Sequence, residues 1–274
     1  MKIYLEVGIL RRSVALLLLW MLVSTGVANG QPIARVERPE ATMLQHGDLI
    51  WPRNPKAIVL YDSGLEGTRD EMKRQWESER DAFVRQVRAN ADASLQQRQI
   101  ATNMEALSYE EFTLRYLAGQ QRADIEQFGA FDDLFSVGHV GIVEVDTDGT
   151  RYVIEAVWGK VGKVQRVSYT DWLKDRAGSW VWVGRLDNLN PEQLSSFVAK
   201  AKSYLGAPYN FWVFDLADES GFYCSKLVWL SLMKSLNIAL DDNPKSLRGF
   251  WFSPKQAWTS RWITRVNSPR DYTY

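Results

Sequence analysis

The pattern of apolar and polar residues predicts β-strands in three stretches of the chain, and in one of them the residues alternate with the period of two that is typical of strands. The clearest stretch is 138–157, where two β-branched runs flank Asp-Thr-Asp-Gly, so it predicts a β-hairpin. Residues 179–186 predict a third strand, and residues 43–51 predict a turn that leads into a short strand. These stretches indicate a small antiparallel sheet.

Helical periodicity dominates the region between the first strand and the hairpin. Residues from about 70 to 101 are strongly charged and predict one helix, whose apolar positions recur near helical spacing at Met72, Trp76, Phe83 and Val87. A second helix is predicted over 108–119, because Ser108 and Glu111 form a capping box at its start. We therefore expect a helical insertion at about 52–130.

Two further helices are predicted after the strands. Asn190 suits an N-cap, Pro191 suits the first helical position, and Gly206 ends the segment. Residues 222–237 (FYCSKLVWLSLMKSLN) are apolar on nearly every side, which predicts a helix buried in the core with Cys224 in its first turn. The predicted fold class is α+β, with the sheet packed on the helix that carries Cys224.

The N-terminus has the pattern of a secretory signal peptide: a basic start, an apolar run at 14–23, and small and polar residues up to Gly30. The apolar run is too short to span a bilayer. We expect cleavage near Gly30 and a single domain over 31–274. The mature protein is expected to be periplasmic or secreted, with no stable membrane insertion. An uncleaved membrane anchor is the alternative.

Charge and composition restrict the partners. Without residues 1–30 the chain keeps 30 basic and 32 acidic side chains, a net charge of about −2, which gives no general argument for binding nucleic acid or an anionic membrane. Hydrophobic residues make up 46% of the sequence, which excludes a disordered protein. Only His46 and His139 accompany the single cysteine, too few soft ligands for a structural zinc site, so no metal or cofactor is expected.

Cys224 is the only cysteine among 274 residues. An unpaired thiol in an oxidising compartment invites oxidation unless it is buried or useful. At a helix N-terminus, the helix dipole and the unpaired N–H groups favour the thiolate and lower its pKa. A small buried residue at the head of a core helix is the ordinary explanation, but the isolated thiol, its position and an available strand histidine favour a nucleophile.

Residues 206–229 (GAPYNFWVFDLADESGFYCSKLVW) resemble the motif of NlpC-type cysteine peptidases, in which a Gly-x-Pro-Tyr turn precedes Gly-Phe-x-Cys-Ser-x-Leu-Val. In ordinary members the histidine follows the cysteine, whereas here GHVGIVEV, YVIEA and GDLIW precede it. This order is similar to that of the circularly permuted branch of YiiX-like and YebB-like papain-fold hydrolases. The resemblance covers 43–51 and roughly 136–254, and it implies a permuted papain-like fold with the block at 52–130 outside it.

The resemblance also implies roles for individual residues. Cys224 would attack a carbonyl and form a thioester, and His139 would accept its proton and pass it to the leaving amine. Glu155 would orient the imidazole, and the Tyr209 hydroxyl would help the Cys224 N–H hold the oxyanion. Asp48 matches a residue typical of the family, and we expect it to brace the start of its strand.

Each of these residues also has an ordinary structural explanation. His139 could be a satisfied core or edge residue, and Glu155 could point outward from its strand. Tyr209 could be an ordinary aromatic residue of a turn. His46, the other histidine, lies in a turn with no matching partner pattern, so we expect it to be a surface residue.

The register of the hairpin decides whether Glu155 can reach His139. If residues 147–149 form a three-residue loop with the glycine left-handed, Glu155 faces Gly141, on the same side of the sheet as His139. If 148–149 form a two-residue loop, Glu155 points to the opposite side. A catalytic triad therefore requires the three-residue loop, or a bulge that restores parity.

The function expected is amide hydrolysis by a cysteine peptidase or amidase. Cell-wall stem peptides are the leading substrate, because the compartment supplies them and the wider family cuts them. A lipid or N-acyl amide hydrolase or acyltransferase and a catalytically silent binding module are the alternatives, so the expected partner is a peptide, a muropeptide or an acyl-amide. Residues from about 65 to 130 would form a lid over the cleft or a docking arm for a partner.

Overall fold

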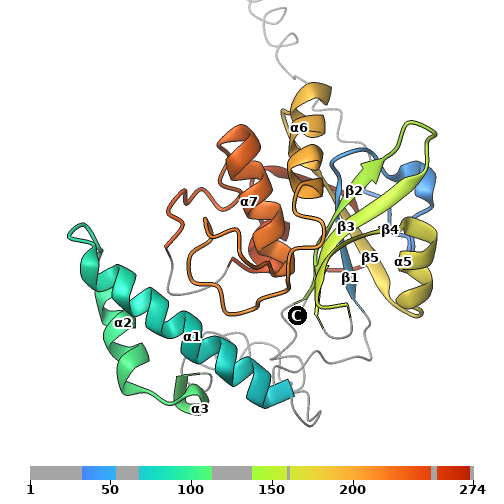
Figure 1. Ribbon diagram of the computed structural model, residues 1–274. Helices are drawn as coiled ribbons and strands as arrows, with labels where there is room; N and C mark the ends of the chain where they lie inside the picture. Colours follow the sequence, from blue (N-terminus) through green and yellow to red (C-terminus); the bar gives the residue numbers. More distant parts are fainter. Residues whose placement is uncertain (1–32, 54–67, 113–137, 159–160, 248–251, 272–274) are drawn as a thin grey trace, which may run out of the picture. The chain divides into compact units, whose positions relative to one another are not determined.

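The computed structural model describes residues 33–53, 68–112, 138–158, 161–247 and 252–271. They contain a six-stranded sheet in which every neighbouring pair is antiparallel, with the strand order β4-β3-β2-β1-β5-β6 (Figure 1). The strands are β1 Leu49–Arg53, β2 Gly141–Val145, β3 Arg151–Val157, β4 Lys163–Ser168, β5 Trp180–Leu186 and β6 Ile263–Asn267. The predicted antiparallel sheet is confirmed, and β4 and β6 extend it beyond the strands that the sequence predicted.

The helices are η1 Ala41–Met43, α1 Thr68–Ala89, α2 Leu95–Ala106, α3 Tyr109–Phe112, α5 Tyr169–Asp175, α6 Pro191–Lys202, α7 Cys224–Leu236 and α8 Pro254–Trp258. The predicted start of α6 is confirmed, since the Asn190 side chain accepts from the Gln193 N–H and completes a capping box. The predicted core helix is also confirmed: α7 begins at Cys224, ends at the left-handed Asn237, and is buried from 224 to 232.

The β2–β3 hairpin has the register that places Glu155 on the side of His139. Val143 faces Val153, and continuing this register places Glu155 opposite Gly141. The Gly149 N–H donates to the Asp146 carbonyl at 2.9 Å, and Gly149 has φ +83°, a conformation that glycine adopts without strain. The prediction of a three-residue loop is therefore confirmed.

The two faces of the sheet pack against different helices (Figure 1). Ile142 and Ile154 lie in one hydrophobic cluster with residues of α6 and α7, whereas Val143 and Val153 lie in a second cluster with Trp172 of α5. Alternate residues of a strand point to opposite faces, so these clusters identify the two sides directly. Glu155 has the parity of Val153 and therefore belongs to the α5 side.

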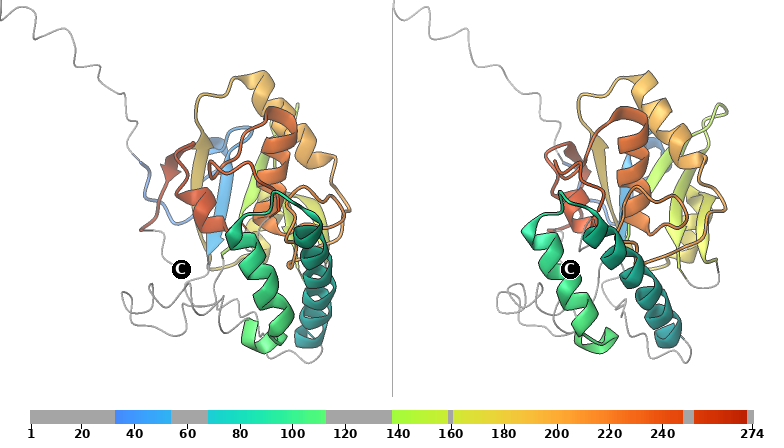
Figure 2. Two further views of the ribbon diagram at one scale, coloured as in Figure 1. Left: turned by 90° about the vertical axis from the view of Figure 1, so that its left-hand side faces the viewer. Right: turned by 60° about the vertical axis from the view of Figure 1, so that its left-hand side comes forward.

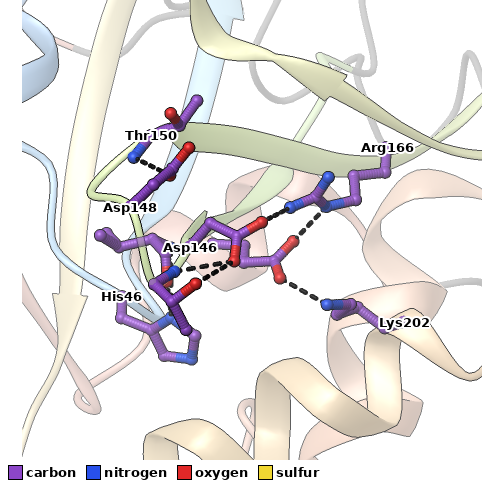
Figure 3. A network of polar contacts seen from close by, with 9 residues as sticks. His46, Asp146, Asp148, Thr150, Arg166 and Lys202 are labelled. Carbon is purple, nitrogen blue, oxygen red and sulfur yellow. Dashed lines mark hydrogen bonds and ion pairs between the residues drawn. The ribbon is translucent and has the colours of Figure 1, made fainter.

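A network of ion pairs joins β2, β4 and α6 (Figure 3). Glu144 of β2 is 4% exposed, and its carboxylate pairs with Arg166 of β4 and with Lys202 of α6, whose Nζ lies 2.6 Å from Oε1. Arg166 Nη2 also lies 2.7 Å from Asp146 Oδ2. Because a buried carboxylate is costly unless it is paired, this network stabilises the charge of Glu144 and fixes α6 to the sheet.

The helical insertion differs from the prediction at 70–101. That segment forms two helices, α1 and α2, which lie side by side with a break between Ala89 and Leu95 (Figure 2). Ser94 caps α2, and Gln97 completes a capping box with it. The prediction of one continuous helix is therefore wrong, because these side-chain caps start a new helix within the charged run.

The predicted start of the next helix is confirmed by the contacts of Ser108. The Glu111 N–H donates to Ser108 Oγ at 3.2 Å, and the Ser108 N–H donates to the Glu111 carboxylate at 2.9 Å. α3 follows directly, and the remainder of the predicted helix, 113–119, lies outside the described residues.

The insertion shares its hydrophobic core with α7. Trp76 and Phe83 of α1 are buried in the cluster that also holds Leu227 of α7. The Phe83 and Phe214 ring centroids are 5.5 Å apart, a separation typical of packed aromatic pairs. α1 therefore contributes to the core that surrounds α7.

The signal peptide expected at 1–30 lies outside the described residues, as do 54–67 and 113–130 of the insertion. Within the described ranges, no helix is both long and apolar enough to cross a membrane.

Candidate active site

Cys224 is the first residue of α7, where main-chain groups favour its thiolate. The residue is 7% exposed, and the sulfur accepts hydrogen bonds from the N–H groups of Val140 and Ser225. Tyr223, at the N-cap, makes no side-chain bond to the helix, because its hydroxyl accepts from the Phe252 N–H at 3.0 Å. The first-turn N–H groups of α7 thus remain available to the sulfur, as the helix position predicted.

His139 lies two residues before β2 and connects the thiol to Glu155. Its Nε2 lies 2.7 Å from Glu155 Oε2, and its ring forms a hydrogen bond with the Cys224 sulfur. Because Nε2 is engaged by the carboxylate, Nδ1 is the nitrogen left for the sulfur. The His139 side chain is 23% exposed, so the ring is not sealed from solvent. The structure thus brings Cys224, His139 and Glu155 together.

Glu155 is fully buried and accepts hydrogen bonds from four side chains. Oε2 accepts from His139 and from Trp172 Nε1, each at 2.7 Å, and Oε1 accepts from Gln165 Nε2 at 2.9 Å. Arg176 Nη2 lies 2.8 Å from Oε2 and 2.9 Å from Oε1. The alternative in which Glu155 points outward to solvent is therefore excluded.

The charges of these three groups stabilise one another. Burial lowers the pKa of His139, but the Cys224 thiolate and then Glu155 outweigh it and raise that pKa to about 9. Burial raises the pKa of Cys224, but the His139 imidazolium and the two N–H groups lower it overall. Burial also raises the pKa of Glu155, but His139 and then Arg176 bring it down to about 2. The three shifts therefore all favour the charged forms: a thiolate, an imidazolium and a carboxylate.

This charge state predicts the pH dependence of alkylation. Below about pH 8.5, the ordinary thiol pKa, iodoacetamide should alkylate Cys224 faster than an ordinary thiol, because the lowered pKa leaves a larger fraction of Cys224 ionised. His139→Ala should move the midpoint upward, since burial then acts without the imidazolium. Mass spectrometry of the alkylated protein measures the rate at a single site, because the chain has one cysteine. Equal midpoints for the two proteins would contradict the ion pair.

Tyr209 lies beside the segment that leads into Cys224. It forms a parallel bridge with Phe222, and its N–H donates to the Gly162 carbonyl at 2.8 Å. Burial and then the negative charge of Cys224 raise the pKa of the Tyr209 hydroxyl well above its ordinary value. The hydroxyl therefore stays protonated and can donate a hydrogen bond within electrostatic reach of the sulfur.

Asp48 makes a separate set of contacts that brace β1. It is 1% exposed, and its oxygens lie 2.8 Å from Arg185 Nε and 2.9 Å from Arg185 Nη2. Oδ2 also accepts from the Gln45 N–H at 2.8 Å. This two-point pairing ties the residue that precedes β1 to the neighbouring strand β5, which confirms the expected structural role.

The other histidine, His46, is not the surface residue that the sequence predicted. It is half-buried, and its Nδ1 lies 3.1 Å from the Val145 nitrogen and 3.2 Å from the Val145 oxygen. The Gly47 N–H donates to the Val143 carbonyl at 2.9 Å. The turn before β1 thus folds onto the end of β2, and this tertiary contact covers the imidazole.

The residues that surround Glu155 were not selected from the sequence. Trp172 lies on α5, and Arg176 follows this helix as its C-cap. The start of α5 is marked by Ser168, which accepts from the Asp171 N–H. Gln165 faces Glu155 in the β3–β4 register. The helix cap was a readable signal for α5, but it does not tell which buried group the helix covers. Among the described residues, no group of three or more His, Cys, Asp or Glu side chains is placed to hold a metal ion.

The chain matches a family model described as the permuted papain-like amidase enzyme, YaeF/YiiX, C92 family, over residues 120–273. The matched segment is more than half of the chain. The chain belongs to the permuted papain-like amidase family. The resemblance inferred from the motifs is therefore confirmed, and the protein is a papain-like cysteine amidase or peptidase.

Among solved structures, the chain is similar to one described as the crystal structure of metalloprotein yiiX from Escherichia coli O157:H7. The two are 25% identical with a TM-score of 0.39, and the match covers 47% of this chain and 81% of that chain. No curated protein matches the chain. The segment matched by the permuted papain-like amidase family includes Cys224, His139, Glu155 and Tyr209, whereas β1, α1 and α2 precede it.

Proposed function

We propose that this permuted papain-like amidase is an exported enzyme that uses Cys224, His139 and Glu155 as a catalytic triad. The observation that carries the proposal is the continuous path of hydrogen bonds from the Cys224 sulfur through the His139 ring to the buried Glu155 carboxylate. A nucleophile, a base and an orienting carboxylate in contact are the constellation that acyl transfer requires.

In the proposed mechanism the Cys224 thiolate attacks the scissile carbonyl carbon, and the carbonyl electrons move onto oxygen. The His139 imidazolium then gives its proton to the amine nitrogen, the C–N bond breaks, and a thioester remains on Cys224. A water molecule attacks the thioester while His139 takes its proton. Cleavage of the C–S bond releases the carboxylic acid and restores the thiolate.

Glu155 and Tyr209 act on different charges in this mechanism. Glu155 holds the imidazole through Nε2 and stabilises its charged form, which leaves Nδ1 for the sulfur and the leaving group. The Tyr209 hydroxyl donates a hydrogen bond to the oxyanion, as does the Cys224 N–H. The motif order of the chain supports a circularly permuted papain-like arrangement in which the antiparallel sheet packs on α7.

Tyr209→Phe tests the oxyanion role. If the hydroxyl stabilises charge that develops only in the transition state, the variant should lower kcat by about 10- to 1000-fold with little change in KM. Tyr152→Phe is the matched control, because the Tyr152 ring lies 3.3 Å below the Arg166 guanidinium and keeps that contact without its hydroxyl. A change confined to KM would place Tyr209 among the substrate-binding residues instead.

Cell-wall stem peptides are the substrate that best fits an exported amidase of this family. A lipid or N-acyl amide hydrolase or acyltransferase uses the same thioester, so the acyl group and its acceptor distinguish the two. The purified enzyme should be assayed against a panel of muropeptides and a panel of long-chain N-acyl amides, with Cys224→Ala as the blank. Cleavage of acyl amides alone would reject the cell-wall assignment.

Export is a separate part of the proposal. The N-terminal segment supports a signal peptide cut near Gly30, with residues 31–274 as a single hydrolase domain that carries the helical insertion. The mass and N-terminal sequence of the protein recovered outside the cytoplasm measure this directly. A full-length N-terminus on membrane-bound protein would support the uncleaved anchor.

A further inference from the structure

Glu79 of α1 makes a direct contact with the segment that carries Tyr209. Its Oε1 accepts from Asn210 Nδ2 at 2.8 Å, and Asn210 is the residue after Tyr209. α1 precedes the segment that the family model matches, so this contact comes from a part of the chain outside the family match.

Asn210 is held on several sides. Its N–H donates to the Phe222 carbonyl at 3.0 Å, and its Oδ1 accepts from the Trp212 N–H at 3.2 Å. Its Cβ lies close to Gly221, where an added Cβ would come within 2.7 Å of it. With its Oδ1 and backbone N–H already engaged, Asn210 directs its side-chain NH₂ group to Glu79 through one hydrogen bond. Glu79 therefore completes the contacts that fix this residue.

The same carboxylate also faces a buried lysine next to the nucleophile. Lys226 is fully buried, two residues after Cys224, and its Nζ donates to the Gly221 carbonyl at 2.7 Å. Burial lowers the pKa of Lys226, four surrounding carboxylates raise it, and the result is a pKa of about 8. The carboxylates belong to Asp218, Glu79, Asp215 and Glu219. Glu79 is the only one of these four that lies on α1. The insertion thus supplies a charge to the turn that precedes α7.

We propose that Glu79 is a positioning residue: by holding Asn210, it fixes the Tyr209 hydroxyl where it can meet the oxyanion on Cys224. This inference deepens the proposed function and rests on the proposed role of Tyr209. It gives the insertion a part in catalysis that a lid or a docking arm alone would not have. Displacement of a group by about 1 Å at an active site can cost about 100-fold in rate.

The experiment measures acylation of Cys224 by p-nitrophenyl acetate through the burst of nitrophenolate. Glu79→Ala should lower the acylation rate by about 10- to 100-fold, because Tyr209 loses its fixed position. Glu79→Gln should restore most of the rate, since its amide oxygen still accepts from Asn210. Asp81→Asn is the matched control, because Asp81 lies on the same helix, is exposed, and pairs with Arg80. It should leave the rate unchanged.

Two further measurements separate positioning from a general loss of structure. In the Tyr209→Phe background, Glu79→Ala should cause no further loss, because the group that it positions is already absent. Alkylation of Cys224 by iodoacetamide should be equal in all variants, since the thiolate is held by other residues. Asn210→Ala should reproduce the effect of Glu79→Ala, and the double variant should be no worse.

The inference is overturned if Glu79→Ala acylates at the wild-type rate, if its loss adds fully to that of Tyr209→Phe, or if alkylation falls in parallel with acylation. A Tyr209→Phe variant with the wild-type acylation rate would overturn both this inference and the oxyanion role of Tyr209. Failure of the proposed nucleophile is recognised separately, because Cys224→Ala would then still hydrolyse substrate.

Discussion

Cys224→Ala should abolish hydrolysis while the protein stays folded. Removal of the nucleophile eliminates the thioester pathway, and in enzymes of this mechanistic type that loss reaches about 10⁶-fold in kcat. The fold should tolerate the change, because alanine is the best helix former and the substitution removes a single buried sulfur atom from the first position of α7. Release of the product acid over time measures activity, and circular dichroism with a thermal melt measures the fold.

Cys224→Ser provides the matched comparison. It keeps a group that can accept the Val140 and Ser225 N–H bonds, but a hydroxyl is not ionised by His139 near neutral pH. Both variants should be inactive, and both should lose the ion pair that raises the pKa of His139. Hydrolysis retained by purified Cys224→Ala would reject Cys224 as the nucleophile.

The hairpin shows which parts of the site can be predicted from sequence. Asp-Thr-Asp-Gly is local turn chemistry, and a three-residue loop with a left-handed glycine fixes the pairing of every residue that follows it. Because side chains alternate along a strand, that register alone decides whether His139 and Glu155 share a face. Their contact, which spans sixteen residues, was therefore within reach of a sequence argument.

The residues that support the His139–Glu155 pair could not be predicted from the sequence. Arg176 and Trp172 reach Glu155 because α5 packs on one face of the sheet, and nothing in their local sequence states which face that is. Glu79 and Asn210 are separated by 131 positions, and their contact depends on how α1 packs near the segment before α7. Tertiary packing, unlike turn chemistry, leaves no local pattern to read.

The helical insertion illustrates the same limit at the level of one element. The charged, helical pattern of 70–101 correctly predicted helix on both sides of Ser94, but such a pattern does not reveal a break of a few residues. The capping pair Ser94 and Gln97 was the signal for the new helix. The capping pair Ser108 and Glu111 was recognised in the sequence, and the start of that helix was predicted correctly.

Glu155→Gln should inactivate the enzyme and destabilise it as well. Both oxygens of Glu155 accept hydrogen bonds, and an amide presents only one oxygen, so at least one donor must face an NH₂ group. Arg176 and the His139 imidazolium also lose their counter-charge. We expect kcat/KM to fall by about 10⁴-fold, as for removal of the orienting carboxylate in a catalytic triad. Breaking a buried ion pair should lower the free energy of unfolding by about 3–5 kcal/mol.

The pH dependence of that destabilisation tests its cause. Glu155 has a pKa of about 2 in the folded protein against 4.5 ordinarily, so its contribution to stability is present above pH 4.5 and is lost as the pH falls through about 2. His139 is shifted the other way, from 6.5 to about 9, so its contribution is present below pH 6.5 and is lost as the pH rises through about 9. Between pH 4.5 and 6.5 both charges contribute in full. The margin by which the free energy of unfolding of the wild type exceeds that of Glu155→Gln should be largest there.

Below pH 4.5 the margin should shrink, because protonated Glu155 resembles the neutral glutamine of the variant. Urea unfolding of both proteins at the same pH values measures this, and the titration of every other carboxylate cancels in the difference. Glu192→Gln is the matched control, because Glu192 is exposed in the first turn of α6. The difference in the free energy of unfolding between the wild type and this variant should be small and nearly constant. A margin for Glu155→Gln that does not change from pH 6 to pH 2 would mean that the glutamine disrupts packing, and the ionised carboxylate would then not be what stabilises the His139–Glu155 pair.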